Sequence, residues 1–334
     1  MRKFIVILIL FLGVALVILS FSELKTIVET LQKANLWFLL LAFLLQISWF
    51  MISGFTFSSI YHLLELKESL QELTLLAVAA NFVNVVAPSA GMGGVVVFIN
   101  HAKRRGYSTG KVTVAGALYI LFDYVAFLGI LTLGLIVLVR RNDLDTSEII
   151  ASIIMFAIAI GLAFFLYLGS RSADKLGKAL ARMARLINRI AHPFIHREYL
   201  NETRAYTFAH EMAESLSSLP RRWHTLIYPL LWAIANKALM TVILVASFLS
   251  FDVPFSAGTI IGGFSISYLF LVVSPTPSGI GVVEGIMALA LNSLNVEWSQ
   301  AVVITLTYRA ITFWVPLGVG ALAFRNLHMN VEEK

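Results

Sequence analysis

Residues 274–285 read SPTPSGIGVVEG and follow directly on an apolar run, YLFLVV (268–273). The twelve residues contain two prolines, three glycines and one carboxylate, Glu284. Proline removes a backbone donor and clashes with the preceding helical turn, while glycine adds backbone freedom. A helix that enters this stretch is therefore expected to end in it.

The composition places this stretch in a membrane protein. The chain has 334 residues, of which 59% are hydrophobic and 13% charged, and its mean hydropathy is +0.85. Soluble domains carry about 45–50% apolar and about 25% charged residues. Lipid cannot hydrogen-bond the N–H and C=O groups of a broken helix, so such a segment must face protein or a water-filled cavity.

Several classes of function are disfavoured at this point. The chain has no cysteine, which excludes disulfides, thiolate metal sites and cysteine nucleophiles. Its seven histidines lie between or beside the apolar runs without an HExxH pattern, so no metal and no cofactor is predicted. The net charge of +6 does not point to nucleic acid, because loops of membrane proteins are rich in Lys and Arg.

The apolar runs predict an all-α polytopic membrane protein, since a spanning helix needs about 20 mostly apolar residues. The N-terminal run resembles a signal peptide, but it is longer than usual and no A-x-A-like cleavage site follows it, so it is interpreted as a retained helix. Two further apolar regions are interrupted, the first by APSAGMGG (87–94) and the second by SPTPSGIG (274–281). The six expected spans are 4–22, 36–58, 112–139, 149–168, 225–250 and 299–323, and the interrupted regions are 73–99 and 255–294.

The two interruptions resemble each other. VVAPSAGMGGVV (85–96) aligns with VVSPTPSGIGVV (272–283) when one residue is inserted. Corresponding interrupted segments in two halves are typical of inverted-repeat transporters; chance similarity of Val/Gly-rich sequence is the alternative. The prediction is one integral membrane domain, 1–334, with repeats at about 1–139 and 149–334.

The distribution of Lys and Arg favours one topology. If both interrupted regions are re-entrant hairpins, 19 of these residues fall in cytoplasmic loops and 4 outside. With eight full spans, the alternative, the split is 16 to 7. The positive-inside rule prefers six spanning helices plus two re-entrant hairpins. Both termini are then cytoplasmic, and the expected location is the cytoplasmic (inner) membrane of a cell.

The longest polar region, 169–224, is expected to form a cytoplasmic helical loop. Apolar residues recur there at helical spacing beside a basic stripe, which predicts a basic amphipathic helix, with a second helix at about 197–218. The functional interpretation is an anionic-lipid surface over 169–190; the alternative is an ordinary cytoplasmic hairpin. The stripe consists of Lys175, Lys178, Arg182, Arg185 and Arg189.

Four charged residues lie inside apolar runs, namely Asp123, Lys237, Glu284 and Arg309. An unpaired charge at the bilayer centre costs about 2.5–3.5 kcal/mol on insertion scales, so each is a candidate functional residue. Two acids and two bases could also pair off and serve only to fix helix positions.

The interrupted segments complete a candidate site. A helix that restarts after Gly279–Gly281 presents unpaired N–H groups and the positive end of its dipole, which suits an anion, and the same holds after Gly91–Gly94. Asn84 could add hydrogen bonds or cap a freed carbonyl. Arg309 and Lys237 beside such helix starts would suit a phosphate.

Three motifs carry a family resemblance. The first is the run Pro-x-Pro-x-Gly-x-Gly-x-x-Glu, and the second is an Arg followed by Trp-x-Pro and a small residue in the last helix. The third is the first interruption with a basic stretch after it. The residues are Pro275, Pro277, Gly279, Gly281 and Glu284; Tyr308, Arg309, Trp314, Pro316 and Gly320; and Asn84, Pro88, Gly93, Gly94, Lys103, Arg104 and Arg105.

With these motifs the chain resembles, along essentially its full length, the flippase-like transmembrane domain of the lysylphosphatidylglycerol synthase family. Two departures stand out: Val95 occupies a position where members often have an acid, and Ser278 one where glycine is common. About ten residues follow the last helix, too few for an aminoacyl-transferase domain. The resemblance therefore implies lipid translocation without lipid aminoacylation.

The leading hypothesis is a lipid flippase or transporter, without chemical conversion, for a phospholipid or polyprenyl-phosphate-type lipid. The alternatives are a membrane-embedded lipid or glycosyl transferase, an ion channel or exchanger, and a scaffold subunit for another enzyme. Homo-oligomerisation is left open. The predicted substrate-binding residues are Arg309, Glu284, Gly279, Gly281, Pro275, Pro277, Gly91, Gly93, Gly94, Asn84, Lys237, Asp123 and Tyr308.

Overall fold

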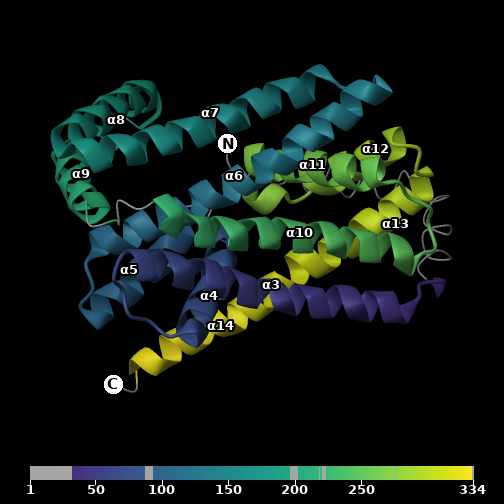
Figure 1. The fold of residues 1–334 in the computed structure, drawn as a ribbon, viewed down its shortest axis with the longest axis horizontal. Helices are drawn as coiled ribbons and strands as arrows, with labels where there is room; N and C mark the ends of the chain where they lie inside the picture. The colour runs from purple at the N-terminus through teal and green to yellow at the C-terminus, as the bar shows by residue number, and fades with distance from the viewer. Residues whose placement is uncertain are drawn as a thin grey trace. The chain divides into compact units, whose positions relative to one another are not determined.

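The computed structural model describes residues 32–86, 93–195, 202–217, 219, 223–274 and 276–332, and all regular structure within them is helical (Figure 1). Five helical segments are long and apolar enough to cross a membrane. They coincide with five of the six segments predicted to span; the sixth, 4–22, lies outside the described residues. The five are α3 (Leu36–Leu63), α6 (Thr109–Arg141), α7 (Thr146–Arg171), η1 (Trp223–Leu226) with α10 (Ile227–Ser250), and α13 (Trp298–Arg309) continued by η3 (Ala310–Trp314) and α14 (Val315–Glu332).

Both interrupted regions are broken helices, as the sequence predicts. The first forms α4 (Leu70–Val86) and α5 (Gly93–Arg105), and the residues between them lie outside the described part. The second forms α11 (Ala257–Val273), the short 3₁₀ turn η2 (Pro277–Gly279) and α12 (Val282–Ser293). The polar loop forms α8 (Ala173–Ile195) and α9 (Glu202–Ser217), which pack against each other (Figure 1).

The chain divides into two compact units. Among the described residues, unit 1 consists of those up to 49, those in 129–152 and those in 238–317, and unit 2 consists of those in 50–128, in 153–237 and from 318 onward. The division falls within the five long segments, so each of them contributes one part to each unit. The α11–α12 pair belongs to unit 1 and the α4–α5 pair to unit 2.

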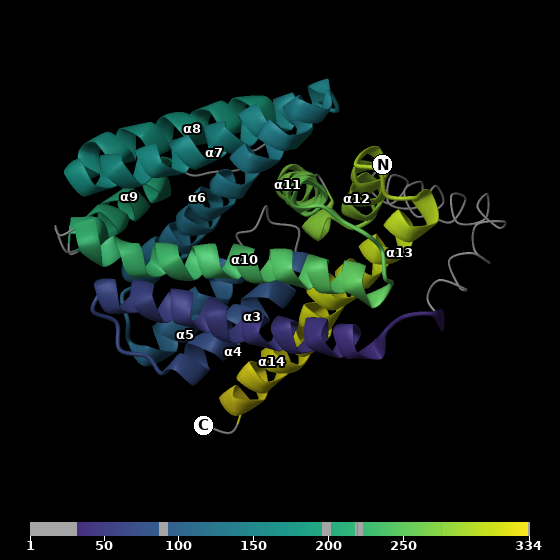
Figure 2. The ribbon, with the colours of Figure 1, turned by 45° about the vertical axis from the view of Figure 1, so that its right-hand side comes forward.

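In unit 1, α11 and α12 form an antiparallel hairpin (Figures 1 and 2). A Cβ on Gly263 would lie 2.6 Å from the side chain of Leu291, so the absence of a side chain there permits the close packing. The two ends of the hairpin are joined by Arg141, which donates to the Leu294 carbonyl at 3.2 Å and to the Ser256 hydroxyl at 3.1 Å. The chain therefore enters and leaves this hairpin at the same end.

In unit 2, α4 and α5 form a second antiparallel hairpin. At its tip the side chain of Asn84 accepts a hydrogen bond from the Gly94 N–H. At its open end the Tyr107 hydroxyl, just beyond α5, donates to the Lys67 carbonyl, just before α4. This hairpin also begins and ends at one place.

The last long segment changes its helical winding directly after Arg309. Residues Ala310–Trp314 form a π-helical turn, in which the Val315 N–H donates to the Ala310 carbonyl. Pro316, two residues further on, has no N–H to give to the fourth residue before it, and its ring would crowd that carbonyl. The wider turn accommodates the proline, and such π turns occur often at functional sites.

Candidate functional site

The side chain of Arg309 is the centre of a charged cluster in unit 1. Its Nε donates to Glu284 Oε1 at 2.7 Å, and its Nη2 donates to the Ser278 carbonyl at 3.2 Å. The guanidinium also lies over the ring of Phe313, 4.5 Å from the ring centre. Since only 6% of the Arg309 side chain is exposed, against 23% for Glu284, the cluster opens on the carboxylate side.

The backbone of the break is held in an unusual conformation. Ser278, Gly279 and Gly281 all have positive φ angles, of 49°, 70° and 79°. This left-handed region is available to glycine at little cost, whereas a residue with a side chain is strained there. The conformation turns the Ser278 carbonyl toward Arg309, and it strains Ser278 in a way that a glycine at this position would avoid.

Glu284 lies in the first turn of α12, as predicted, and it also caps the helix start. Its Oε2 accepts a hydrogen bond of 2.7 Å from the Gly281 N–H. One carboxylate therefore holds both the start of α12 and the Arg309 side chain of α13. The Gly281 N–H, one of the amides predicted to bind an anionic ligand, donates to this carboxylate in the structure.

The second buried pair lies in unit 2. Lys237 of α10 and Asp123 of α6 form an ion pair with an Nζ–Oδ1 distance of 2.5 Å. Only 2% of the Lys237 side chain is exposed, against 16% for Asp123. The two buried cations and the two partly buried acids thus form two ion pairs, the arrangement that keeps their cost in lipid low.

Asn84 and Gly94 stabilise the tip of the first hairpin. The Asn84 Oδ1 accepts the Gly94 N–H at 2.6 Å, so this side chain caps the start of α5. Its predicted hydrogen bond to a freed carbonyl is not the one seen here, and donation by its amide to a ligand stays a prediction. Gly93 is the first residue of α5, so the helix begins within the Gly91–Gly94 stretch after which a restart is predicted.

The remaining predicted residues are placed as follows. Pro277 begins the 3₁₀ turn η2. Tyr308 is buried, with 6% exposed, next to Arg309 in α13. Pro275 and Gly91 lie outside the described residues, so the structure does not place them.

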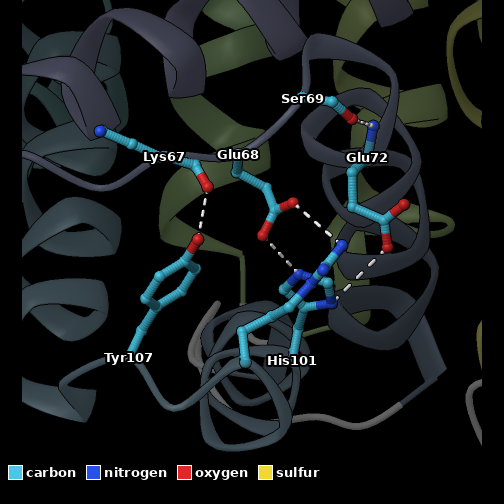
Figure 3. Close-up of polar contacts among 7 residues, drawn as sticks. Lys67, Glu68, Ser69, Glu72, His101 and Tyr107 are labelled. Carbon is cyan, nitrogen blue, oxygen red and sulfur yellow. Dashed lines mark hydrogen bonds and ion pairs between the residues drawn. The ribbon is translucent and has the colours of Figure 1, made fainter.

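The structure contains a polar cluster at the open end of the α4–α5 hairpin that was not predicted from the sequence (Figure 3). His101 Nε2 lies 2.9 Å from Glu68 Oε2, and His101 Nδ1 lies 3.6 Å from Glu72 Oε1. Arg105 adds a weaker contact of 3.4 Å to Glu68. These partners are up to 37 residues apart, so no local spacing predicts their contact, although the acids near the start of α4 and the bases near the end of α5 are visible in the sequence.

Together, five apolar helical segments and two charge pairs buried among helices define a polytopic α-helical membrane protein. The chain belongs to the lysylphosphatidylglycerol synthase family: the model of its TM region matches residues 4–320. The family resemblance inferred from the sequence is confirmed.

Two relatives of similar length are UPF0104 membrane proteins. A UPF0104 membrane protein of Methanothermobacter thermautotrophicus is 22% identical over 319 residues, covering 92% of this chain and 90% of the relative. A UPF0104 membrane protein of Methanocaldococcus jannaschii is 23% identical over 328 residues, covering 96% and 93%. Both are similar to this chain along nearly their whole length.

Proposed function

We propose that this protein is a lipid transporter that moves a phosphate-bearing lipid headgroup between membrane leaflets without converting it chemically. One observation carries the proposal: the nearly buried guanidinium of Arg309 lies beside a broken helix in a membrane protein. Only two of its five N–H groups donate to described residues, one to Glu284 and one to Ser278. The planar fork of N–H groups matches a phosphate well.

In the proposed cycle, a lipid phosphate replaces Glu284 and the Ser278 carbonyl as the partner of Arg309. Glu284 is then free to bind an amine of the headgroup or a proton. The hydrogen bond to the Gly281 N–H keeps the carboxylate in place meanwhile. Rocking of the two predicted repeats would expose the site to each leaflet in turn.

Translocation in reconstituted vesicles tests the proposal. Fluorescent phosphatidylglycerol and phosphatidylethanolamine serve as substrates, and a fluorescent diacylglycerol serves as the phosphate-free lipid. Arg309→Gln should slow phospholipid movement at least about tenfold, since hydrogen bonds to charged groups contribute about 1.5–3 kcal/mol each. Glu284→Gln should slow it while retaining part of the cap on Gly281.

The exposed Arg140 offers a matched control, because Arg140→Gln removes the same charge in the same unit. Arg309→Lys keeps the charge opposite Glu284 but loses the planar fork, so it should fold well and still transport slowly. Wild-type rates in both Arg309 variants would refute the role of Arg309. Ion flux without lipid movement would favour a channel or exchanger, and a new lipid product would favour a transferase.

We further propose that both hairpins are re-entrant, with six spanning helices and cytoplasmic termini. The lengths of α4, α5, α11 and α12, 17, 13, 17 and 12 residues, correspond to about 26, 20, 26 and 18 Å at 1.5 Å per residue. All are shorter than the bilayer core of about 30 Å. Because the chain has no cysteine, single cysteines at Phe255 and Asn295 can be labelled directly, and both should react from the same side of the membrane.

The amphipathic helix α8 supports a further part of this proposal, a surface that binds anionic lipid. Its five basic residues between Lys175 and Arg189 are all exposed, and two apolar residues among them, Met183 and Leu186, are 43% and 57% exposed. The other side of α8 packs on α9, where the Tyr206 hydroxyl donates to Asp174 and lowers the pKa of that carboxyl. Replacing the basic residues with glutamine should reduce binding of the protein in nanodiscs to anionic vesicles.

A further inference from the structure

A groove on unit 2 is lined by residues of α4, α5 and α14, and none of these residues belongs to either charge pair. Its volume is about 170 Å³. Leu76 and Val83 of α4 and Phe324 and Leu327 of α14 contribute apolar side chains to its lining. The lining residues from α5 include polar and basic side chains as well as apolar ones.

One stripe of α5 changes from apolar to basic along the groove. Val96 and Val97 are followed one turn later by Asn100 and His101, and a further turn by Arg104. Eight residues of helix span about 12 Å. The groove therefore offers hydrocarbon contact at one end and hydrogen-bond donors at the other.

The polar end carries a net positive charge. Lys103, Arg104 and Arg105 are exposed in the last turn of α5, and Arg104 makes one long hydrogen bond, of 3.4 Å, to the Leu327 carbonyl. The opposing carboxylates, Glu68 and Glu72, face His101 (Figure 3). Arg104 is thus the cation that lines the groove.

We propose that this groove binds one anionic phospholipid of the surrounding bilayer. Its phosphate contacts Arg104 and Asn100, and the first part of an acyl chain lies along Val96 and Val97. The volume is below the roughly 300–1,000 Å³ of sites that enclose a whole small ligand. It suits a molecule that inserts one segment and leaves the rest in the bilayer. The site does not require the protein to transport lipid.

The test is lipid binding to the purified full-length protein, measured by native mass spectrometry during titration with phosphatidylglycerol or phosphatidylcholine. Arg104→Gln should weaken phosphatidylglycerol binding about fivefold, the worth of one basic residue near anionic lipid. It should leave phosphatidylcholine binding unchanged. Lys103→Gln is the matched control, since it removes the same charge from the same turn without lining the groove, and it should have a clearly smaller effect.

A second variant tests the apolar end. Val96 is 51% exposed, so Val96→Trp fills the groove from outside and should abolish the saturable phosphatidylglycerol site. Ile153→Trp, at a 62% exposed position of the same unit, should not. Arg104→Lys should retain most of the binding.

Three results would overturn the proposal. Equal weakening by Arg104→Gln and Lys103→Gln would show a diffuse surface charge effect. Retention of the saturable site in a folded Val96→Trp variant would show that the lipid binds elsewhere. If that variant does not fold, the comparison of the Arg104 and Lys103 variants, both at exposed positions, tests the proposal by itself. Competition by inorganic phosphate at the same concentration as the lipid would show an anion site that is not a lipid site. A variant that loses this binding but still translocates lipid, or one that keeps the binding but no longer translocates, would show that the groove and the transport function are independent.

Discussion

In each of the two helical hairpins a side chain accepts a backbone N–H at the start of the second helix, but the two side chains differ. In α4–α5 a neutral side chain, Asn84, accepts the Gly94 N–H, whereas in α11–α12 a carboxylate, Glu284, accepts the Gly281 N–H. A neutral capping side chain needs no charged partner, whereas a carboxylate at membrane depth needs a counter-ion. Arg309 is that counter-ion, and it also binds the Ser278 carbonyl of the break.

The comparison explains why the candidate site gathers at the second break. Val95 follows the first Gly-Gly, and the first turn of α5 contains no acidic residue, so no carboxylate is available there to attract a cation. The buried pair of unit 2, Asp123 and Lys237, lies on α6 and α10 instead of on the hairpin. A charged cap converts a structural break into a candidate binding site.

The largest expected effect comes from removing the charged cap. Glu284→Ala leaves Arg309 buried without its partner, and breaking a buried pair in this way costs about 3–5 kcal/mol. Unfolding of the purified protein by SDS in mixed micelles measures this change. The control is Glu214→Ala at an exposed position of α9, which should change little. A loss no larger than that of Asn84→Ala would remove the distinction between the two caps.

The glycines of the second break should rank next. Gly279→Ala combines a positive φ of 70° with a Cβ that would lie 2.3 Å from Val283 Cγ2, so it should cost more than the strain of about 1–2 kcal/mol alone. Gly281→Ala meets no atom within 4 Å and should cost only the strain. Ser278→Gly relieves strain and should be neutral or stabilising. The same SDS titration ranks the three, and the reverse order of the two alanine variants would contradict the turn geometry.

The neutral cap should be worth less than the charged one. Asn84→Ala removes the acceptor of the Gly94 N–H and should destabilise the protein by about 1 kcal/mol, the usual value of a helix cap. Asn84→Asp keeps an acceptor oxygen and tests the comparison directly, because it brings a charge to the first hairpin without a counter-ion. We expect Asn84→Asp to be the more damaging change in lipid, seen as a lower thermal midpoint in nanodiscs.

The smallest effect is expected when the whole pair of unit 2 is replaced. Asp123→Leu together with Lys237→Met should change stability by no more than about 1 kcal/mol, because replacing both ions by apolar groups is often neutral. The same treatment of Glu284 and Arg309 should remain destabilising, since it also removes the cap on Gly281 and the bond to Ser278. Equal outcomes would show that both pairs serve only to position helices.

The sequence predicted the breaks better than it predicted what surrounds them. The five long apolar helices, and the ends of α4 and α11 at the two breaks, follow from residue types within one segment. Proline, glycine and the length of an apolar run act on the local backbone. The pairing of Arg309 with Glu284, across 25 residues, was one of several arrangements that two acids and two bases allow. The hydrogen bond from Arg141 to the Leu294 carbonyl joins residues that are 153 positions apart, and no local sequence pattern predicts it.

The amino-acid sequence by itself determined that this is a helical membrane protein of the lysylphosphatidylglycerol synthase family with two interrupted segments. Those properties depend on transfer of side chains to lipid and on local backbone freedom, which each segment carries alone. Only the tertiary structure decided that Glu284 caps α12, that Arg309 binds both Glu284 and the Ser278 carbonyl, and that an amphipathic groove forms beside α5. These features depend on which side chains from distant segments come within hydrogen-bond distance, and the packing of the helices determines which ones do.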